Sequence, residues 1–178
     1  MTSLGYALNV ADEFIVKISP FCEWTEIVGS IRRLRKQVND IDILVIPKFE
    51  ETKDETLFGE TVRINTLDRK LSSMCIDNIL KLEMNGEKIK RFSQFNDTEI
   101  AIDIYIATRQ TLPTLRLIRT GSKEHNIKLC TRARELGMQL KASGEGLFDA
   151  QLKQLKVESE EDIFRLLGLA YLPPEIRD

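Results

Sequence analysis

Cysteine is scarce in this sequence of 178 residues, where Cys22, Cys75 and Cys130 are the three that occur. Three widely spaced cysteines without a C-x-x-C pattern indicate neither a disulfide framework nor a zinc site, so reduced thiols are expected. Long apolar runs are also missing, since no stretch approaches the roughly 20 apolar residues of a membrane span. Asp12 and Glu13 occur where a secretory signal would be apolar. We therefore expect a cytoplasmic protein with no membrane partner.

An excess of positive charge is absent as well, because 26 Lys and Arg residues oppose 28 Asp and Glu residues, for a net charge of −2. This balance argues against a protein that coats nucleic acid through its overall charge, although a local basic surface would suffice for binding. Such a surface is predicted between Arg109 and Lys141, where eight basic residues oppose two acidic ones. The 42% apolar content is ordinary for a globular protein with one domain or two small ones.

Two aspartates interrupt a short apolar run. The segment from Val38 to Ile46 is dense in β-branched and aliphatic residues, which predicts a largely buried strand that contains Asp40 and Asp42. Because residues two apart on a strand point to the same face, the two carboxylates should lie side by side. Two like charges so close need a positive charge between them. Mg²⁺ binds such carboxylates together with substrate phosphates, so the pair predicts a magnesium site.

A candidate phosphate-binding turn precedes this strand. Gly29 and Ser30 follow two apolar residues and lead into the basic segment 31–36, a plausible short helical turn. Free backbone N–H groups, a serine hydroxyl and guanidinium groups together form an anion site. An Asp-x-Asp pair or a basic run is by itself commonly a solvated surface feature. The order of turn, arginines and aspartates indicates nucleotidyl or phosphoryl transfer.

Periodicity and turn signals predict the other elements of the N-terminal half. They are helices over 4–18 and 64–80, strands over 22–28 and 99–108, a surface loop over 48–60, and a hairpin over 80–92 with a type I′ turn at Asn85-Gly86. Asp103 lies within the last strand. A buried carboxylate there needs a partner, which is either the metal inferred at Asp40 and Asp42 or an arginine.

The C-terminal half predicts two helices separated by Thr120-Gly121-Ser122, with Ser122 as the N-cap of the second helix and Gly137 as its end. A last short helix is expected after Ser159. His125 is the single histidine. No Ser or Cys nucleophile motif accompanies it, which favours a place on the helix surface over a catalytic role.

These motifs together resemble the X family of DNA polymerases, the group that contains polymerase beta. The resemblance runs from about Cys22 to Asp178 and rests on five ordered motifs: Gly29-Ser30 with Arg32-Arg33, Asp40-Ile41-Asp42, Asp103, the segment from Thr120 to Asn126, and the tail from Glu158 to Glu175. It implies an α/β (α+β) fold. A nucleotidyltransferase palm with a mixed sheet and flanking helices would span 1–108, and a small α+β C-terminal subdomain 109–178.

The resemblance also implies roles for individual residues. Asp40, Asp42 and Asp103 would hold two Mg²⁺ ions, for which Mn²⁺ would substitute. Ser30 and Arg33 would bind the phosphates of an incoming dNTP, with Gly29 allowing close approach of the backbone. The remaining contacts would be made to the nucleotide by Thr120, Gly121, Ser122, Lys123 and Asn126, and to DNA by Arg119, Lys128, Arg132 and Arg134.

The sequence departs from the family pattern at several positions. Ile118 and Arg119 stand where the family commonly has two aromatic residues, which puts sugar discrimination in question. Cys130 stands where a template-contacting arginine is expected, and Ala101 where a basic residue often buttresses the third carboxylate. The chain begins after the lyase and helix-hairpin-helix regions of full-length members, as in compact, virus-encoded members of the family.

The sequence therefore predicts a monomeric, Mg²⁺-dependent DNA polymerase. It would add nucleotides from dNTPs to the 3′ end of primer-template or gapped DNA, as in short-gap repair. Three alternatives stay open: an untemplated terminal transferase, a nucleotidyltransferase that modifies RNA, a protein or a small molecule, and a nucleic-acid-binding module with an inactive palm.

Overall fold

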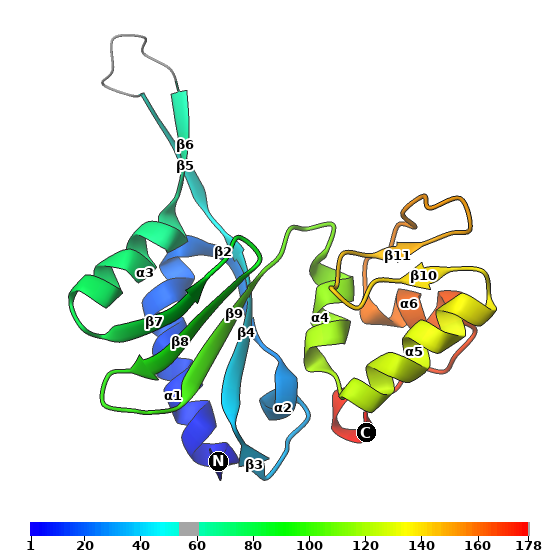
Figure 1. Ribbon diagram of the computed structural model, residues 1–178, viewed down its shortest axis with the longest axis horizontal. Helices are drawn as coiled ribbons and strands as arrows, with labels where there is room; N and C mark the ends of the chain where they lie inside the picture. The colour runs from blue at the N-terminus through cyan, green and yellow to red at the C-terminus, as the bar shows by residue number, and fades with distance from the viewer. Residues whose placement is uncertain (54–60, 178) are drawn as a thin grey trace.

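The computed structural model describes residues 1–53 and 61–177. Two parts lie side by side in Figure 1: an N-terminal part, residues 1–108, built on a central sheet, and a C-terminal part, residues 109–177, built mainly from helices. Within the described residues, no helix combines the length and the apolar character that crossing a membrane requires. The expected boundary at residue 108 stays a prediction, and it lies between the last strand of the sheet and the next helix.

The N-terminal part is organised around one five-stranded sheet. Its spatial order is β2 (Cys22–Ile27), β4 (Asp40–Pro47), β9 (Ala101–Ile106), β8 (Ile89–Phe95) and β7 (Leu80–Asn85). The neighbours β4 and β9 are parallel, whereas the other pairs are antiparallel. This arrangement confirms the predicted α+β class with a mixed sheet.

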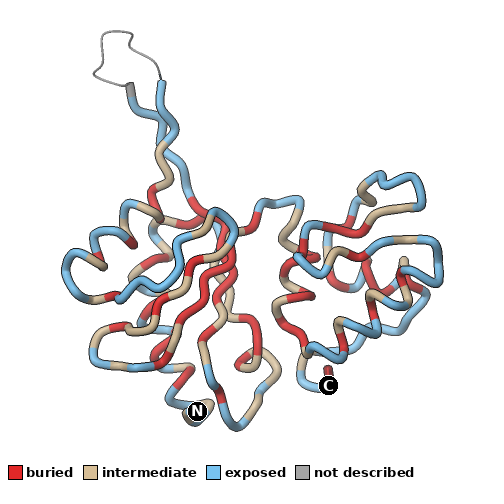
Figure 2. The backbone as a smooth tube through the Cα atoms, viewed as in Figure 1, coloured by how far each residue is buried: buried red, intermediate tan, exposed pale blue. Residues whose placement is uncertain are grey.

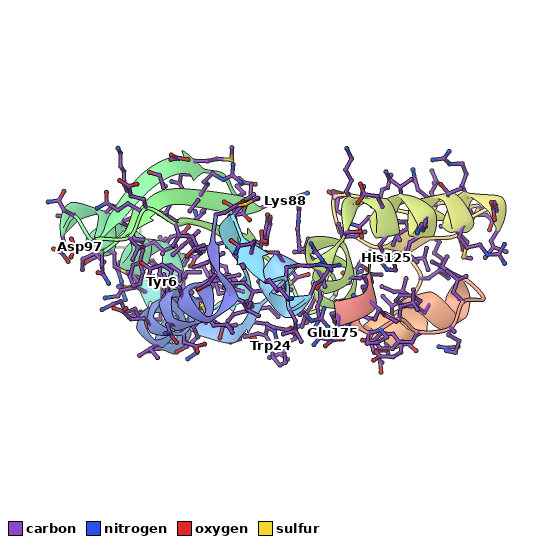
Figure 3. The ribbon with its side chains drawn as sticks, turned by 90° about the horizontal axis from the view of Figure 1, so that it is seen from below. Tyr6, Trp24, Lys88, Asp97, His125 and Glu175 are labelled. Atoms are coloured by element: carbon purple, nitrogen blue, oxygen red, sulfur yellow. The ribbon has the colours of Figure 1, made fainter. Side chains whose placement is uncertain are left out.

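Two helices cover one face of this sheet, and the view in Figure 3 shows the sheet and the helices as separate layers. In α1 (Leu4–Ile18), apolar residues recur every three or four positions, and the resulting stripe is buried against the sheet. Ser3 caps the start of α1, and Pro20 follows its end. The second helix, α3 (Thr66–Ile76), begins after the N-cap Asn65. Buried residues concentrate along the strands and the helix faces that meet them (Figure 2).

Two connections differ from the sequence predictions. The segment expected as a loop forms a ribbon of β5 (Phe49–Lys53) and β6 (Thr61–Asn65), which projects from the sheet in Figure 1. Residues 54–60 of that loop lie outside the described residues. The expected type I′ turn is also wrong, because neither Asn85 nor Gly86 has a positive φ. Asn85 instead ends β7, and three residues connect it to β8.

Short elements complete the N-terminal part. A two-residue strand β1 (Thr2–Ser3) pairs with β3 (Gln37–Val38), so the strand expected from Val38 onward is divided before β4. A 3₁₀ turn η1 (Ser19–Phe21) links α1 to β2. Between β2 and β3 lies the single helical turn α2 (Gly29–Arg32), so a short helix is present but starts two residues earlier than expected and includes only Ile31 and Arg32 of the basic segment 31–36.

The C-terminal part has its own apolar core. Its elements are α4 (Leu112–Thr120), α5 (Lys123–Glu135), the small hairpin β10 (Gln139–Leu140) and β11 (Leu147–Phe148), α6 (Glu160–Leu166) and the 3₁₀ turn η2 (Pro174–Ile176). As predicted, Ser122 caps α5, its side chain accepting from the backbone N–H of His125 at 3.2 Å. Leu115 of α4 also packs against residues of the central sheet, so the two parts share apolar contacts.

Candidate active site

The three predicted carboxylates lie on the two parallel strands at the centre of the sheet. Asp42 of β4 is paired in register with Asp103 of β9, and Asp40 is paired with Ala101. Because side chains alternate along a strand, Asp40 and Asp42 share a face, and pairing in a sheet places Asp103 beside them. The sheet thus brings together three residues separated by up to 63 positions in the sequence.

Asp103 is tied to an arginine that the sequence did not single out. Its side chain is 2% exposed and accepts two hydrogen bonds from Arg91, from Nε at 2.6 Å and from Nη2 at 2.5 Å. Arg91 lies directly opposite Asp103 on the antiparallel neighbour β8. Of the two partners considered for Asp103, the structure shows the arginine. Arg91 could have been found only from the register between β8 and β9, and that register cannot be read without knowing how the hairpin of residues 80–95 pairs with β9.

Tyr105 is a second residue that sequence reasoning missed. It follows Asp103 by two positions on β9 and points to the same face of the strand. Its hydroxyl donates to Oδ1 of Asp42 at 3.1 Å and lies 3.4 Å from Oδ2 of Asp103. The alternation of the strand could have drawn attention to Tyr105, since it places a hydroxyl next to the carboxylates.

The negative charges of Asp40 and Asp42 are not compensated by an ion pair with a basic side chain among the described residues. The pKa of Asp42 is raised to about 7, chiefly because the group is buried and then because Asp40 repels its charge, while the hydrogen bond from Tyr105 acts in the opposite direction. Within residues 1–53 and 61–177, neither Asp40 nor Asp42 has an ion-pair partner. An uncompensated pair of oxygen ligands is the environment that a divalent cation would stabilise.

The three carboxylates carry the oxygen ligands that a divalent cation would require. No three Asp, Glu, His or Cys side chains within the described residues already form a group that could hold a metal ion. Both oxygens of Asp103 are engaged by Arg91, whereas the Asp40 and Asp42 carboxylates are free of basic partners there. Asp40 and Asp42 would therefore be the first ligands for a cation, and Asp103 would join them if its contact with Arg91 were exchanged.

The turn at Gly29 lies directly beside Asp42. Gly29 has φ +64°, and a Cβ atom at this position would lie 1.9 Å from Oδ2 of Asp42. Both the backbone conformation and the space therefore require glycine here. In the next residue, Ser30, the buried Oγ has no hydrogen-bond partner among the described residues. An unpaired buried hydroxyl, one residue after the glycine that contacts Asp42, matches the predicted place for a phosphate oxygen.

Arg33 connects this turn to the C-terminal part. One of its Nη atoms donates to the carbonyl oxygen of Thr120, and its buried Nε has no partner within the described chain. Burial and the charge of Arg35 lower the pKa of Arg33. A desolvated guanidinium group with an unused donor is suited to an anion that it can pair with.

A cavity of about 500 Å³ opens beside Arg33, between α4 and α5. We call it the α4–α5 cavity. The predicted nucleotide and DNA contacts that line it are Arg33, Arg119, Gly121, Ser122, Lys123, Asn126 and Arg134, together with Ile118, Ile127, Cys130, Thr131 and Ala142. Its wall therefore carries five cationic or amide side chains, of which Arg119 also lies over the ring of Tyr105 in β9, and this chemistry is suited to a nucleotide.

Three of the contacts predicted in the C-terminal part do not line this cavity. Thr120 is fully buried, and its Oγ1 accepts a hydrogen bond from Arg32 at 2.5 Å. Arg132 donates to the carbonyl oxygen of Leu167 at 3.0 Å, so it points toward α6. Lys128 is exposed on α5 but does not line the cavity. Their predicted contacts with nucleotide or DNA stay predictions.

His125, labelled in Figure 3, is buried rather than exposed on its helix, so the expected surface position is wrong. Its side chain is stacked against Phe164, with the ring centres 5.8 Å apart. Burial, followed by the charges of Arg177 and Lys128, lowers its pKa to about 4. The residue therefore belongs to the core between α5 and α6, away from the predicted chemistry.

Buried ion pairs hold the two parts together next to the site. Glu160 of α6 accepts hydrogen bonds from Arg32 of α2 at 2.6 and 3.0 Å, and from Arg177 at 3.2 and 2.9 Å. We call these three residues the Glu160 cluster. Arg116 of α4 makes a further two-pronged contact with Glu26 of β2. Because Arg32 precedes Arg33, the Glu160 cluster also fixes the position of the Arg33 backbone.

Comparison with protein families and known structures gives consistent matches. Residues 115–178 match the family model of the DNA polymerase beta thumb. The chain is 30% identical over 179 residues to the DNA polymerase/3′-5′ exonuclease PolX of Bacillus subtilis, an alignment that covers 98% of this chain and 28% of that protein. It is 42% identical over 81 residues to human DNA-directed DNA/RNA polymerase mu, covering 44% of the chain and 16% of the relative.

A viral relative is matched along most of its length. The Repair DNA polymerase X of African swine fever virus is 28% identical over 152 residues, which are 84% of this chain and 79% of the viral protein. The fold is similar to that of Leishmania infantum polymerase beta in a ternary P/T complex, with a TM-score of 0.75 at 20% identity, covering 99% of this chain and 76% of that one. The C-terminal family match and the alignments along nearly the whole chain show that the protein is similar to DNA polymerases of the X family, and it spans less than a third of the length of the bacterial and human relatives.

Proposed function

We propose that this protein is a divalent-metal-dependent DNA polymerase that adds a nucleotide from a dNTP to a DNA 3′-hydroxyl. The observation that carries the proposal is the grouping of Asp40, Asp42 and Asp103 on adjacent strands, next to a turn in which Gly29 contacts Asp42, the Ser30 hydroxyl is unpaired and Arg33 lines the α4–α5 cavity. Carboxylates for cations, donors for phosphates and a cavity for the nucleotide are the parts that nucleotidyl transfer requires.

The chain's own residues would bind and orient the reactants. Asp40, Asp42 and Asp103 would hold two Mg²⁺ ions, which when bound supply Lewis-acid activation of the 3′-hydroxyl and stabilise the leaving oxygens. Ser30 and Arg33 would bind the outer phosphates. The 3′ oxygen then forms a bond to the α-phosphorus as the bond to the bridging oxygen breaks, and pyrophosphate leaves. A carboxylate oxygen of Asp103 would accept the hydroxyl proton.

Gapped DNA is the acceptor that we favour. The name of the viral relative describes a repair polymerase, and a second Leishmania infantum polymerase beta structure, with a TM-score of 0.75, is a ternary gap complex. The exposed Lys123, Lys128 and Arg134 on α5 would contact the phosphate backbone. About three such contacts predict that the logarithm of affinity falls against the logarithm of salt concentration with a slope of about −3. Binding that hardly changes with salt would contradict this acceptor.

Extension of a labelled primer tests the proposal. Single-stranded, recessed and one-nucleotide-gapped DNA would be compared in Mg²⁺ and in Mn²⁺, for the wild type and for Asp42→Asn. Asp12→Asn is the matched control, because Asp12 is an exposed aspartate on α1. We expect extension directed by the template base in the wild type and the control, and its loss in Asp42→Asn.

Other outcomes would select the alternatives. Addition that ignores the template base would indicate a terminal transferase. Addition to RNA, to a protein or to a small molecule, with none to DNA, would indicate a different acceptor. DNA binding with no transfer to any acceptor would indicate a binding module with an inactive palm.

The walls of the α4–α5 cavity favour ribonucleotides as a second substrate class. Ile118 packs in the core of the C-terminal part and the Arg119 guanidinium group lies over the Tyr105 ring, so this pair lines the cavity without placing an aromatic ring in it. The name of one relative, DNA/RNA polymerase mu, is consistent with this substrate class. The ratio of kcat/KM for dCTP to that for CTP on one gapped template tests it. We expect a ratio below about 100, and a much larger ratio would contradict ribonucleotide use.

A further inference from the structure

Tyr105 is the hydrogen-bond donor that orients the central carboxylate. Its side chain is 7% exposed, and its hydroxyl donates to Oδ1 of Asp42 at 3.1 Å. The second acceptor in reach, Oδ2 of Asp103, is farther away at 3.4 Å. A phenol has one proton to donate. The shorter distance therefore gives that proton to Asp42.

Asp42 has few other restraints on its carboxylate. Its Oδ2 lies next to the backbone of Gly29, which has no side chain that could restrain the carboxylate. No basic side chain among the described residues forms an ion pair with it. Within that part of the chain, Tyr105 supplies the hydrogen bond that fixes the rotation of the carboxylate.

Arg119 covers the ring of Tyr105 from the other part of the molecule. Its guanidinium carbon lies 4.3 Å from the ring centre, and its buried Nε has no hydrogen-bond partner among the described residues. A desolvated cation over an aromatic face is attracted to the ring, and it draws electron density from the hydroxyl. Arg119 comes from α4 of the C-terminal part, whereas Tyr105 belongs to the central sheet.

We propose that Tyr105 is a positioning residue for the metal-binding carboxylates and that Arg119 couples it to the C-terminal part. The contact makes the orientation of Asp42 depend on where α4 lies. Residues that orient metal ligands commonly change metal affinity by 10- to 100-fold when they are removed. The inference rests on the proposed function, since it assigns a role within the same metal site.

Titration with Mn²⁺ alone, with the free ion measured by electron paramagnetic resonance, tests the positioning role without requiring activity. We expect Tyr105→Phe to weaken Mn²⁺ binding by about tenfold, because the ring and its packing stay while the donor is lost. Tyr6→Phe is the matched control, because Tyr6 is exposed on α1, and it should bind Mn²⁺ as the wild type does. Thermal unfolding of both variants in EDTA establishes that the fold is retained.

A double-mutant cycle tests the coupling through Arg119. Arg119→Met removes the cation and keeps an unbranched apolar chain over the ring, and we expect about threefold weaker Mn²⁺ binding. Arg119→Lys should restore part of that loss, since it returns a cation to the site. In the Tyr105→Phe background the same Arg119→Met change should have a much smaller effect.

The outcomes separate this inference from the proposed function. Mn²⁺ binding within twofold of the wild type in Tyr105→Phe would overturn the positioning role, and full additivity of the two substitutions would overturn the coupling. A wild type that binds Mn²⁺ through Asp42 but transfers no nucleotide would overturn the proposed function alone. In that case the affinity ratio between wild type and Tyr105→Phe still decides the role of Tyr105.

Discussion

Asp42 is a residue whose burial destabilises the metal-free fold. Its pKa is raised to about 7 by burial and by the charge of Asp40. An unfolded chain loses this proton near the ordinary value of 3.8, whereas the folded chain keeps it until about pH 7. Between these values the folded state binds more protons, so stability falls as the pH rises, and the loss is complete above pH 7.

Substitution of Asp42 should therefore increase the stability of the metal-free protein while it abolishes activity. We expect Asp42→Asn to raise the free energy of unfolding by about 2 kcal/mol at pH 8 in EDTA, since asparagine carries no charge to desolvate. The gain should shrink toward zero near pH 4, and primer extension should be lost at every pH. Urea unfolding at the two pH values measures this, with Asp12→Asn as the control. A variant less stable than the wild type at pH 8 would contradict it.

Residue identities in the site were predictable to different degrees. Asp40, Asp42 and Asp103 could be found because alternation along a strand needs only local sequence. Arg91 could not, since its contact with Asp103 depends on the register between β8 and β9. The absence of a nucleophile motif favoured a surface position for His125, but its ring packs against Phe164 of α6, a contact that local sequence does not indicate.

At the scale of elements, the turn from β2 into α2 is the most constrained. Gly29→Ala should reduce primer extension by at least about 100-fold and lower the free energy of unfolding by about 2 kcal/mol, because its Cβ would meet Oδ2 of Asp42 at 1.9 Å in a positive-φ conformation. Circular dichroism melting and primer extension check the two effects.

A matched glycine is available for comparison. Gly5 lies in α1, and a Cβ atom added there would have no neighbour within 4 Å, so Gly5→Ala should keep full activity. It should also stabilise the fold slightly, since alanine favours a helix interior over glycine by up to about 1 kcal/mol. If Gly29→Ala and Gly5→Ala had equal activity and stability, the turn would tolerate a side chain, and this would contradict the structure.

Elements with a strong apolar period or clear end signals were predictable, whereas the polar β5–β6 ribbon was not. The apolar period of residues 4–18 predicted the extent of α1, which Pro20 follows. The β5–β6 ribbon gave no such signal, since its strands carry charged residues on exposed faces and it packs on little else. The Asn85-Gly86 pair misled because the Asn85 side chain accepts a hydrogen bond from Lys90 at 2.6 Å, which suits the end of a strand.

At the scale of the whole molecule, the join between the two parts could not be predicted from local sequence. Arg32 and Glu160 are 128 positions apart, and nothing in either segment indicates the other. The exposed pair Lys88 and Glu145, 2.6 Å apart, also joins the parts, and Lys88 is labelled in Figure 3 at the edge of the sheet. Exposed pairs contribute little to stability, so the buried Glu160 cluster is the stronger connection.

The Glu160 cluster should make the stability of the molecule sensitive to acid. Burial alone would raise the pKa of Glu160, but hydrogen bonds from Arg32 and Arg177 lower it to about 2, below the ordinary 4.5. A carboxylate with a lowered pKa stabilises the fold fully above pH 4.5, and this contribution is lost as the pH falls toward 2. Glu160→Gln should therefore lower the free energy of unfolding by about 3 kcal/mol at pH 7, where it leaves two buried arginines without their anion.

The difference between Glu160→Gln and the wild type should narrow steadily below pH 4.5 and be small near pH 2.5. Urea unfolding across this range measures it, with Glu158→Gln as the control, because Glu158 pairs with Lys156 at the exposed surface and should change little. The same substitution of Glu160 should raise KM for the nucleotide, since Arg32 would no longer hold the backbone of Arg33 in place. A stability difference that stays constant with pH would mean that Glu160 acts through packing and not through its charge.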